Sequence, residues 1–255
     1  MMKKDRPRAT PEKSRPSIFW PLAAIVVPIM GLIAKVEIVD GHKLPREGAY
    51  ILAPNHYSEF DPLIVAVATW RLGRAPRFLA KESLFRIPVL GWALRRTGMV
   101  PVARASTVSA ARQTLEASAE IVEHGRGVIV YPEGSLTRDP DMWPMRGKTG
   151  AVRLAIAQGL PVIPVAHWGV QQIMPRYGKL SLWPLRKPVK LIVGDPVDLS
   201  AFAGKQSSQS ALVAATDVVM ARISDLLARL RGEPAPPERW DPSAHGQAET
   251  GRLES

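Results

Sequence analysis

A histidine and an aspartate lie close together in the chain, directly after an apolar run. The run 49–53 ends at Pro54, and His56 and Asp61 follow it five residues apart. This spacing does not place two side chains on one face of a regular helix, but a loop that turns into a helix can bring them together. The carboxylate would then accept the Nδ1–H of the imidazole and leave Nε2 free as a general base. Such a pair can activate a hydroxyl group of a substrate without a Ser or Cys nucleophile.

A second polar cluster follows the apolar run 127–131. Glu133 and Gly134 come first, and Ser135 and Arg138 lie just beyond them. Gly134 permits a tight backbone and the close approach of a ligand. Hydroxyl and guanidinium groups of this kind donate hydrogen bonds to phosphate. The alternative interpretation is an ordinary polar turn with a solvated arginine.

Two further segments carry a weaker signal. Arg104 follows the short run 98–103 and precedes a helix that we expect to begin with Ser106 as its N-cap. A guanidinium group beside a helix N-terminus is a plausible anion site, although an isolated arginine is more often a surface residue. The run 160–165 is apolar and is expected to form core and pocket wall.

Strands and helices are predicted to alternate along the chain, which favours a layered α/β domain. Its central sheet should be mixed, largely parallel and flanked by helices. Pro164 lies inside one predicted strand and favours an edge or irregular position for it. The predicted strands are 36–40, 49–53, 78–80, 100–102, 127–131, 162–167 and 189–193, and the predicted helices are 63–73, 106–125, 148–158 and 212–230.

Composition narrows the classes of function. The chain has 255 residues, enough for one substantial domain, and it has no cysteine, which excludes disulfides, thiolate nucleophiles and cysteine metal sites. Its formal net charge of +11 favours an anionic partner. We find no nucleic-acid-binding signature and no histidine cluster with metal-ligand spacing, so we expect neither nucleic acid nor metal. The apolar segment near the N-terminus favours an anionic membrane surface as the partner, and a generally basic, soluble surface is the alternative.

The N-terminal region favours the same partner. Residues 1–16 are predicted to be a basic, flexible stretch, and 17–35 an apolar helical segment that associates with a membrane. Pro21 and Pro28 argue against a simple spanning helix and favour a short hairpin or an interfacial helix. A cleaved signal peptide and a buried core helix are the alternatives. The catalytic domain is predicted at 36–231 and a disordered tail at 232–255.

Taken together, four blocks in this order resemble the glycerolipid acyltransferase family typified by 1-acylglycerol-3-phosphate acyltransferase. The resemblance covers roughly residues 36–195. The four blocks are Asn55–Asp61, Gly98–Arg104, Tyr131–Gly134 and Leu160–Pro164.

The resemblance implies a role for each matching residue. His56 would be the general base and Asp61 the residue that orients it. Arg104 would bind the phosphate of the acceptor, and Lys81 would face the site. The remaining residues implied in acceptor binding are Glu133, Gly134, Ser135 and Arg138.

The reaction implied is transfer of a fatty acyl group from acyl-CoA, or from acyl carrier protein, to lysophosphatidic acid at the cytoplasmic face of the cell membrane, without a further cofactor. The chain departs from the family pattern at Leu136, where an arginine is usual. Arg138, Arg146 or Lys148 would have to replace it. The alternatives are therefore another lysophospholipid or a glycolipid as acceptor, and a non-catalytic lipid-binding protein on the same fold.

Overall fold

The structure is a computed structural model that describes residues 17–102, 121–248 and 251. Three features singled out in the sequence lie outside these residues: the basic stretch 1–16, Arg104 and most of the helix predicted after Ser106.

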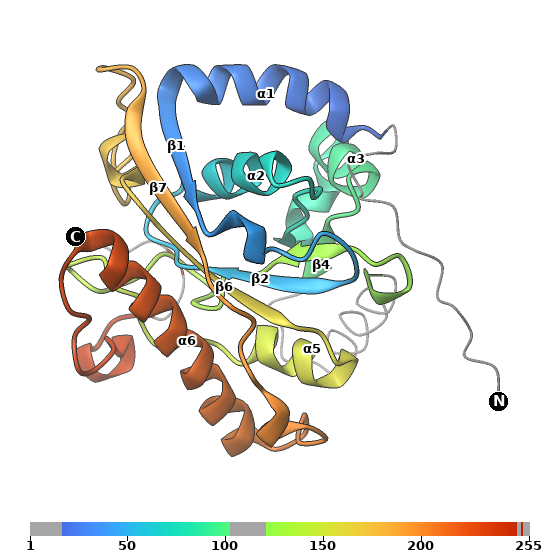
Figure 1. The fold of residues 1–255 in the computed structure, drawn as a ribbon, viewed down its shortest axis with the longest axis vertical. Helices are drawn as coiled ribbons and strands as arrows, with labels where there is room; N and C mark the ends of the chain where they lie inside the picture. The colour runs from blue at the N-terminus through green and yellow to red at the C-terminus, as the bar shows by residue number, and fades with distance from the viewer. Residues whose placement is uncertain (1–16, 103–120, 249–250, 252–255) are drawn as a thin grey trace.

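Five strands form one sheet in which every neighbouring pair is parallel except one (Figure 1). The antiparallel pair is β6 with β7. The predicted mixed, largely parallel sheet flanked by helices is therefore confirmed. In spatial order the strands are β1 (Ala34–Val39), β7 (Lys187–Val193), β6 (Val162–Trp168), β2 (Tyr50–Pro54) and β5 (Gly127–Ile129). A second, two-stranded sheet pairs β3 (Leu79–Lys81) with β4 (Val100–Val102).

Pro164 predicts an edge or an irregular position for its strand, and the edge alternative is wrong because β6 lies in the interior of the sheet. The antiparallel register with β7 begins at the pair Val165–Val193, one residue after Pro164. The carbonyl of Pro164 accepts the N–H of Gly194 at 2.8 Å. Proline therefore stands at the end of this ladder, where its missing N–H is tolerated.

Helices cover both faces of the sheet (Figure 1). Helices α1 and α2 pack against one face with the cluster around Ile64 and Val189, and α5 and α6 pack against the other around Val152 and Val219. The helix bounds are α1 Phe19–Ile33, α2 Asp61–Arg71, α3 Pro88–Arg96, α5 Gly150–Gln158 and α6 Gln209–Arg231, with 3₁₀ turns at Gly41–Lys43, Glu82–Arg86, Val170–Gln172, Ser200–Phe202 and Pro242–His245.

The apolar N-terminal segment forms the single helix α1 rather than a hairpin. Pro21 lies in its first turn, where the missing N–H has no intrahelical partner in any case, and Pro28 is accommodated within it. The helix has 15 residues, about 22 Å in length. Within the described ranges, no helix has the length and apolarity needed to cross a bilayer.

The chain beyond α6 makes defined contacts with the domain, where the sequence predicts a disordered tail. The Trp240 ring stacks on His245 with centroids 3.6 Å apart, and the Trp240 carbonyl accepts the N–H of Arg146 at 2.9 Å. Arg239 pairs with Asp217 on α6. An aromatic ring and a few charged side chains thus fix a segment whose overall composition is polar and rich in proline.

Candidate active site

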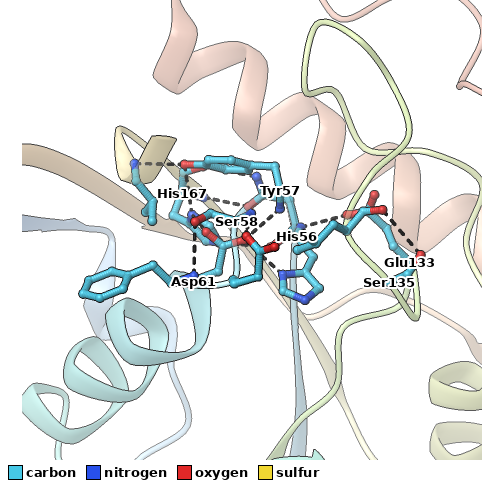
Figure 2. A network of polar contacts seen from close by, with 12 residues as sticks. His56, Tyr57, Ser58, Asp61, Glu133, Ser135 and His167 are labelled. Carbon is cyan, nitrogen blue, oxygen red and sulfur yellow. Dashed lines mark hydrogen bonds and ion pairs between the residues drawn. The ribbon is translucent and has the colours of Figure 1, made fainter. Parts of the chain in front are cut away.

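The loop between β2 and α2 brings His56 and Asp61 together. Asp61 is the first residue of α2, and its Oδ2 accepts the backbone N–H of Tyr57 at 2.7 Å and of Ser58 at 2.8 Å. These bonds fold the loop back on the helix start. As a result His56 Nδ1 lies 3.0 Å from the same oxygen (Figure 2). The predicted proximity of the two side chains at the carboxyl end of a buried strand is observed.

The two members of the pair differ in exposure. Asp61 is completely buried, whereas the His56 side chain keeps 17% of its surface accessible. With Nδ1–H donated to Asp61, the unprotonated ring nitrogen is Nε2, which points away from the polar network in Figure 2. His56 lines an open pocket of about 670 Å³. Nε2 of His56 therefore lies beside an open space, in the position that a general base would need.

Glu133 supports His56 from behind the pocket. It is fully buried, and its Oε1 accepts the His56 backbone N–H at 2.8 Å while Oε2 accepts the N–H of Met145 at 3.1 Å. Burial raises the pKa of Glu133 to about 8, although these two N–H donors act in the opposite direction. The geometry favours a positioning role for Glu133 over the acceptor contact that the resemblance implies.

An aromatic ring fixes the imidazole plane. Tyr131, at the end of the chain segment that continues β5, stacks on His56 with centroids 4.0 Å apart and an interplanar angle of 27°. The ring of Phe78 also stacks on Tyr131, with centroids 6.4 Å apart. Burial raises the pKa of the Tyr131 hydroxyl well above its ordinary value. Tyr131 therefore acts on His56 as a neutral packing surface.

His167 on β6 is a site residue for which the sequence reasoning assigned no role. It is fully buried, its Nε2 lies 3.0 Å from the Asn55 carbonyl, and its Nδ1 lies 3.3 Å from the Tyr57 hydroxyl. The Asn55 side chain bonds both backbone groups of His167, at 2.9 and 3.1 Å. Burial lowers the pKa of His167 and favours the neutral ring. A histidine in an otherwise apolar strand was the signal that could have identified it.

The neutral form of His167 has a consequence for Asp61. Nε2–H donates to the Asn55 carbonyl, so Nδ1 is left as an acceptor for the Tyr57 hydroxyl. Asp61 Oδ1 lies 3.8 Å from this Nδ1 and has no hydrogen bond among the described residues. Among the described residues, His56 and His167 are the histidines paired with Asp61. Because the ring of His167 is held neutral, His56 is the one of the two that can carry a positive charge beside the carboxylate.

The other predicted site residues are spread over several places. Gly134 and Ser135 line the pocket beside His56, as does Leu136. Lys81 lies on β3, and Arg104 lies outside the described residues. Where the structure describes the pocket wall, it contains no lysine or arginine.

Arg138 does not reach the pocket. Its guanidinium is buried and donates to the carbonyls of Ala248 at 3.2 Å and Gly251 at 2.6 Å, and to the Tyr177 hydroxyl. Of the two other candidates for the missing arginine, Lys148 lies against the Gly134 backbone, where a β-carbon would come within 3.0 Å of its Cδ. Arg138, which the sequence predicts to bind the acceptor phosphate, is therefore bonded to carbonyl groups near the C-terminus instead.

In the part of the chain that the structure describes, no three His, Asp or Glu side chains gather as metal ligands would.

The fold and this site together define an α/β protein with a histidine paired to a buried carboxylate at the carboxyl end of a sheet strand. The chain belongs to the acyltransferase family, since the family model described as "Acyltransferase" matches residues 35–168. It is 36% identical over 141 residues to the chloroplast 1-acyl-sn-glycerol-3-phosphate acyltransferase of Brassica napus, covering 55% of this chain and 39% of that protein. The chain therefore spans about two fifths of the length of that plant relative.

Two bacterial proteins match over more of their length. The 1-acyl-sn-glycerol-3-phosphate acyltransferase of Haemophilus influenzae is 27% identical over 201 residues, covering 78% of each chain. The crystal structure of the 1-acyl-sn-glycerophosphate acyltransferase PlsC from Thermotoga maritima superposes with a TM-score of 0.58 at 26% identity, covering 83% of this chain and 80% of that one. The shared fold extends over most of both chains.

Proposed function

We propose that this protein transfers a fatty acyl group from a thioester, acyl-CoA or acyl carrier protein, to the free hydroxyl of 1-acylglycerol-3-phosphate, giving phosphatidic acid. The observation that carries the proposal is the His56–Asp61 pair, 3.0 Å apart, with the histidine at the wall of a pocket large enough for a glycerolipid head. The relatives from Brassica napus and Haemophilus influenzae are 1-acyl-sn-glycerol-3-phosphate acyltransferases by name, which supports the same acceptor.

In the proposed reaction, His56 Nε2 removes the proton from the acceptor hydroxyl as its oxygen attacks the thioester carbonyl carbon. The C–S bond then breaks, and the protonated His56 returns the proton to the departing thiolate. Asp61 Oδ2 accepts the Nδ1–H throughout and stabilises the imidazolium that forms. General-base assistance of this kind contributes about 10²- to 10⁴-fold in rate.

The acceptor phosphate is assigned to Arg104 and Lys81, as the resemblance implies. Arg138 does not take this role, because its N–H groups donate to the carbonyls of Ala248 and Gly251 and to the Tyr177 hydroxyl. Lys148 is the additional candidate cation because its side chain packs against Gly134, a residue that lines the pocket.

A different acceptor is the second candidate. The described pocket wall contains Leu136 at the place of the usual arginine, and it contains the carboxylate of Glu59. A wall of this kind suits an acceptor with less negative charge than a phosphate monoester, such as another lysophospholipid, whose phosphate is a diester, or a glycolipid. The acyl-transfer chemistry of His56 would be unchanged.

We place the protein at the cytoplasmic face of the cell membrane. Large apolar side chains of α1 are exposed, among them Ile25 at 62% and Leu32 at 59%. The net charge of +11 favours an anionic leaflet. Both the acceptor and the product partition into bilayers, so a surface location supplies the substrate.

The test is thiol release from palmitoyl-CoA by the purified full chain, with 1-acylglycerol-3-phosphate, a lysophosphatidylglycerol and a monoacylglycolipid as alternative acceptors. His56→Ala is compared with His42→Ala, which removes a histidine from a 3₁₀ turn outside the pocket. We expect acceptor-dependent release in wild type and His42→Ala, and its loss in folded His56→Ala. Release with only one of the other acceptors would transfer the assignment to that lipid. If wild type releases no thiol with any of the three acceptors, from either palmitoyl-CoA or palmitoyl-acyl carrier protein, the enzyme assignment is refuted.

A further inference from the structure

The loop before β7 carries exposed apolar side chains that no described part of the chain covers. Trp183 is 80% exposed, Leu185 50% and Leu182 47%. Exposed aromatic and aliphatic side chains are ordinary when they are scattered, but a contiguous group marks an interaction surface. These three lie within four residues of one another.

The loop is held in a defined shape rather than left to collapse onto the core. The Ser181 N–H donates to the Ile173 carbonyl at 2.7 Å. The buried Lys187 donates its ammonium to the Ser181 carbonyl and, at 2.9 Å, to the Ser181 hydroxyl. These hydrogen bonds of the Lys187 ammonium join the two ends of the loop. The apolar tip is consequently kept in solvent by specific polar bonds.

The loop and the end of α1 form one surface. The N–H of Arg186 donates to the Leu32 carbonyl at 2.9 Å, which joins the loop to the last turn of α1. Figure 1 shows the loop before β7 reaching the same end of the molecule as α1. Exposed Ile29 and Leu32 of the helix therefore extend the apolar surface of the loop.

The charge around this surface is positive. Between residues 178 and 190 the chain contains four basic and no acidic residues. Lys179 and Arg186 at the two ends of the loop are exposed, as is Lys35 at the start of β1. Exposed tryptophan and leucine bordered by lysine and arginine match the layers of an anionic bilayer, whose acyl region lies beneath phosphate groups.

The same chain segment connects this surface to the pocket. Met174, Tyr177 and Gly178 line the pocket beside His56, and the apolar tip begins directly after them at Leu180. We propose that loop 179–186, together with the end of α1, inserts into an anionic lipid surface and opens the His56 pocket toward the bilayer. A lipid acceptor would then reach His56 by moving laterally out of the membrane. The second part of this inference rests on the proposed acyltransferase function.

The test measures binding of the full chain to vesicles by flotation, using phosphatidylcholine alone and phosphatidylcholine mixed with phosphatidylglycerol. The variant is the double substitution Leu182→Ser, Trp183→Ser. The matched control is Val213→Ser, which removes an exposed apolar side chain from the first turns of α6, on the opposite face of the sheet (Figure 1). We expect wild type and control to bind the anionic vesicles, and the double variant to bind roughly tenfold more weakly. Lys179→Gln should weaken binding only to the anionic vesicles.

Activity gives a second readout. With acceptor embedded in vesicles, turnover of the double variant should fall by a factor similar to its loss of binding. With a short-chain acceptor dissolved as monomers, its turnover should equal that of wild type. Equal vesicle binding by wild type and a folded double variant would overturn the proposal. So would a wild-type dimer that dissociates in the double variant, because the surface would then be a contact between two copies.

The proposed function can fail without this inference failing. His56→Ala should bind vesicles as wild type does, since His56 is not part of the loop surface. Vesicle binding that depends on Trp183, without turnover of any acceptor, would leave the membrane surface intact and refute the enzyme assignment.

Discussion

Replacing Glu133 with glutamine tests the buried carboxyl group that supports His56. Burial raises the pKa of Glu133 from 4.5 to about 8 in the folded protein. The native state therefore binds one more proton than the unfolded state between those two values. Because stability falls with pH wherever the native state binds more protons, this group stabilises the fold fully below about pH 4.5 and loses its contribution as pH rises through 8.

The magnitude follows from the two pKa values. The folded value lies about 3.5 pH units above the unfolded one, and each unit corresponds to about 1.4 kcal/mol. The free energy of unfolding should therefore fall by about 5 kcal/mol across this range. That is a large part of the stability of a domain of ordinary size. The Glu133→Gln variant is neutral at every pH and should not show this component.

At pH 5 the variant should be less stable than wild type. An amide can accept only one of the two N–H bonds, so the N–H of either His56 or Met145 loses its partner, at a cost of about 1–3 kcal/mol. By pH 8 the difference should shrink or reverse, since wild type must then ionise the buried group. Urea unfolding followed by circular dichroism at several pH values measures both free energies.

Glu238→Gln removes an exposed carboxyl and serves as the matched control. A constant difference between wild type and Glu133→Gln from pH 5 to pH 8 would refute the reasoning. It would mean that Glu133 is ionised in the native state and that its two N–H donors outweigh desolvation.

Three further predictions concern the groups around the base. Asp61→Asn should lower kcat by about 10²- to 10⁴-fold in a folded protein, because the imidazolium of His56 loses its carboxylate partner; thiol-release kinetics and circular dichroism measure this. His167→Phe should lower the melting temperature and reduce kcat more than it changes KM, since the Asn55 carbonyl loses its donor, and His167→Gln should recover part of both losses. Arg138→Met should destabilise the fold by roughly 2–4 kcal/mol and make the chain after α6 more sensitive to limited proteolysis, because the donors that hold the C-terminal carbonyls are removed. An unchanged proteolysis pattern would show that Arg138 does not anchor that segment.

The proximity of His56 and Asp61 could be predicted because the contact is local. Five residues separate His56 and Asp61, and a buried strand that ends at a proline restricts where the following loop can go. Continuous apolar runs likewise indicated the interior strands, since a strand buried on both faces must be apolar throughout. The strand β2, in which every residue is buried, is the clearest case.

The sequence pattern was less informative about the place of β6 in the sheet and about the contacts of the chain after α6. Pro164 indicated an edge or irregular strand, and the strand lies inside the sheet because the proline falls at the end of one ladder. The chain after α6 has the composition of a disordered segment, yet Trp240 and Arg239 attach part of it to the domain. A few specific contacts outweigh average composition in both cases.

By itself, the sequence determined the alternation of strands and helices, the apolar N-terminal helix, and the proximity of His56 and Asp61. Only the tertiary structure decided that His167, 112 residues beyond Asn55, bonds to the residue before the base, and that Arg138 is engaged by the C-terminal segment instead of the pocket. The physical reason is the range of the interactions. Hydrogen bonds within a few residues are constrained by the backbone between them, whereas contacts between distant segments depend on how the whole sheet and its helices pack.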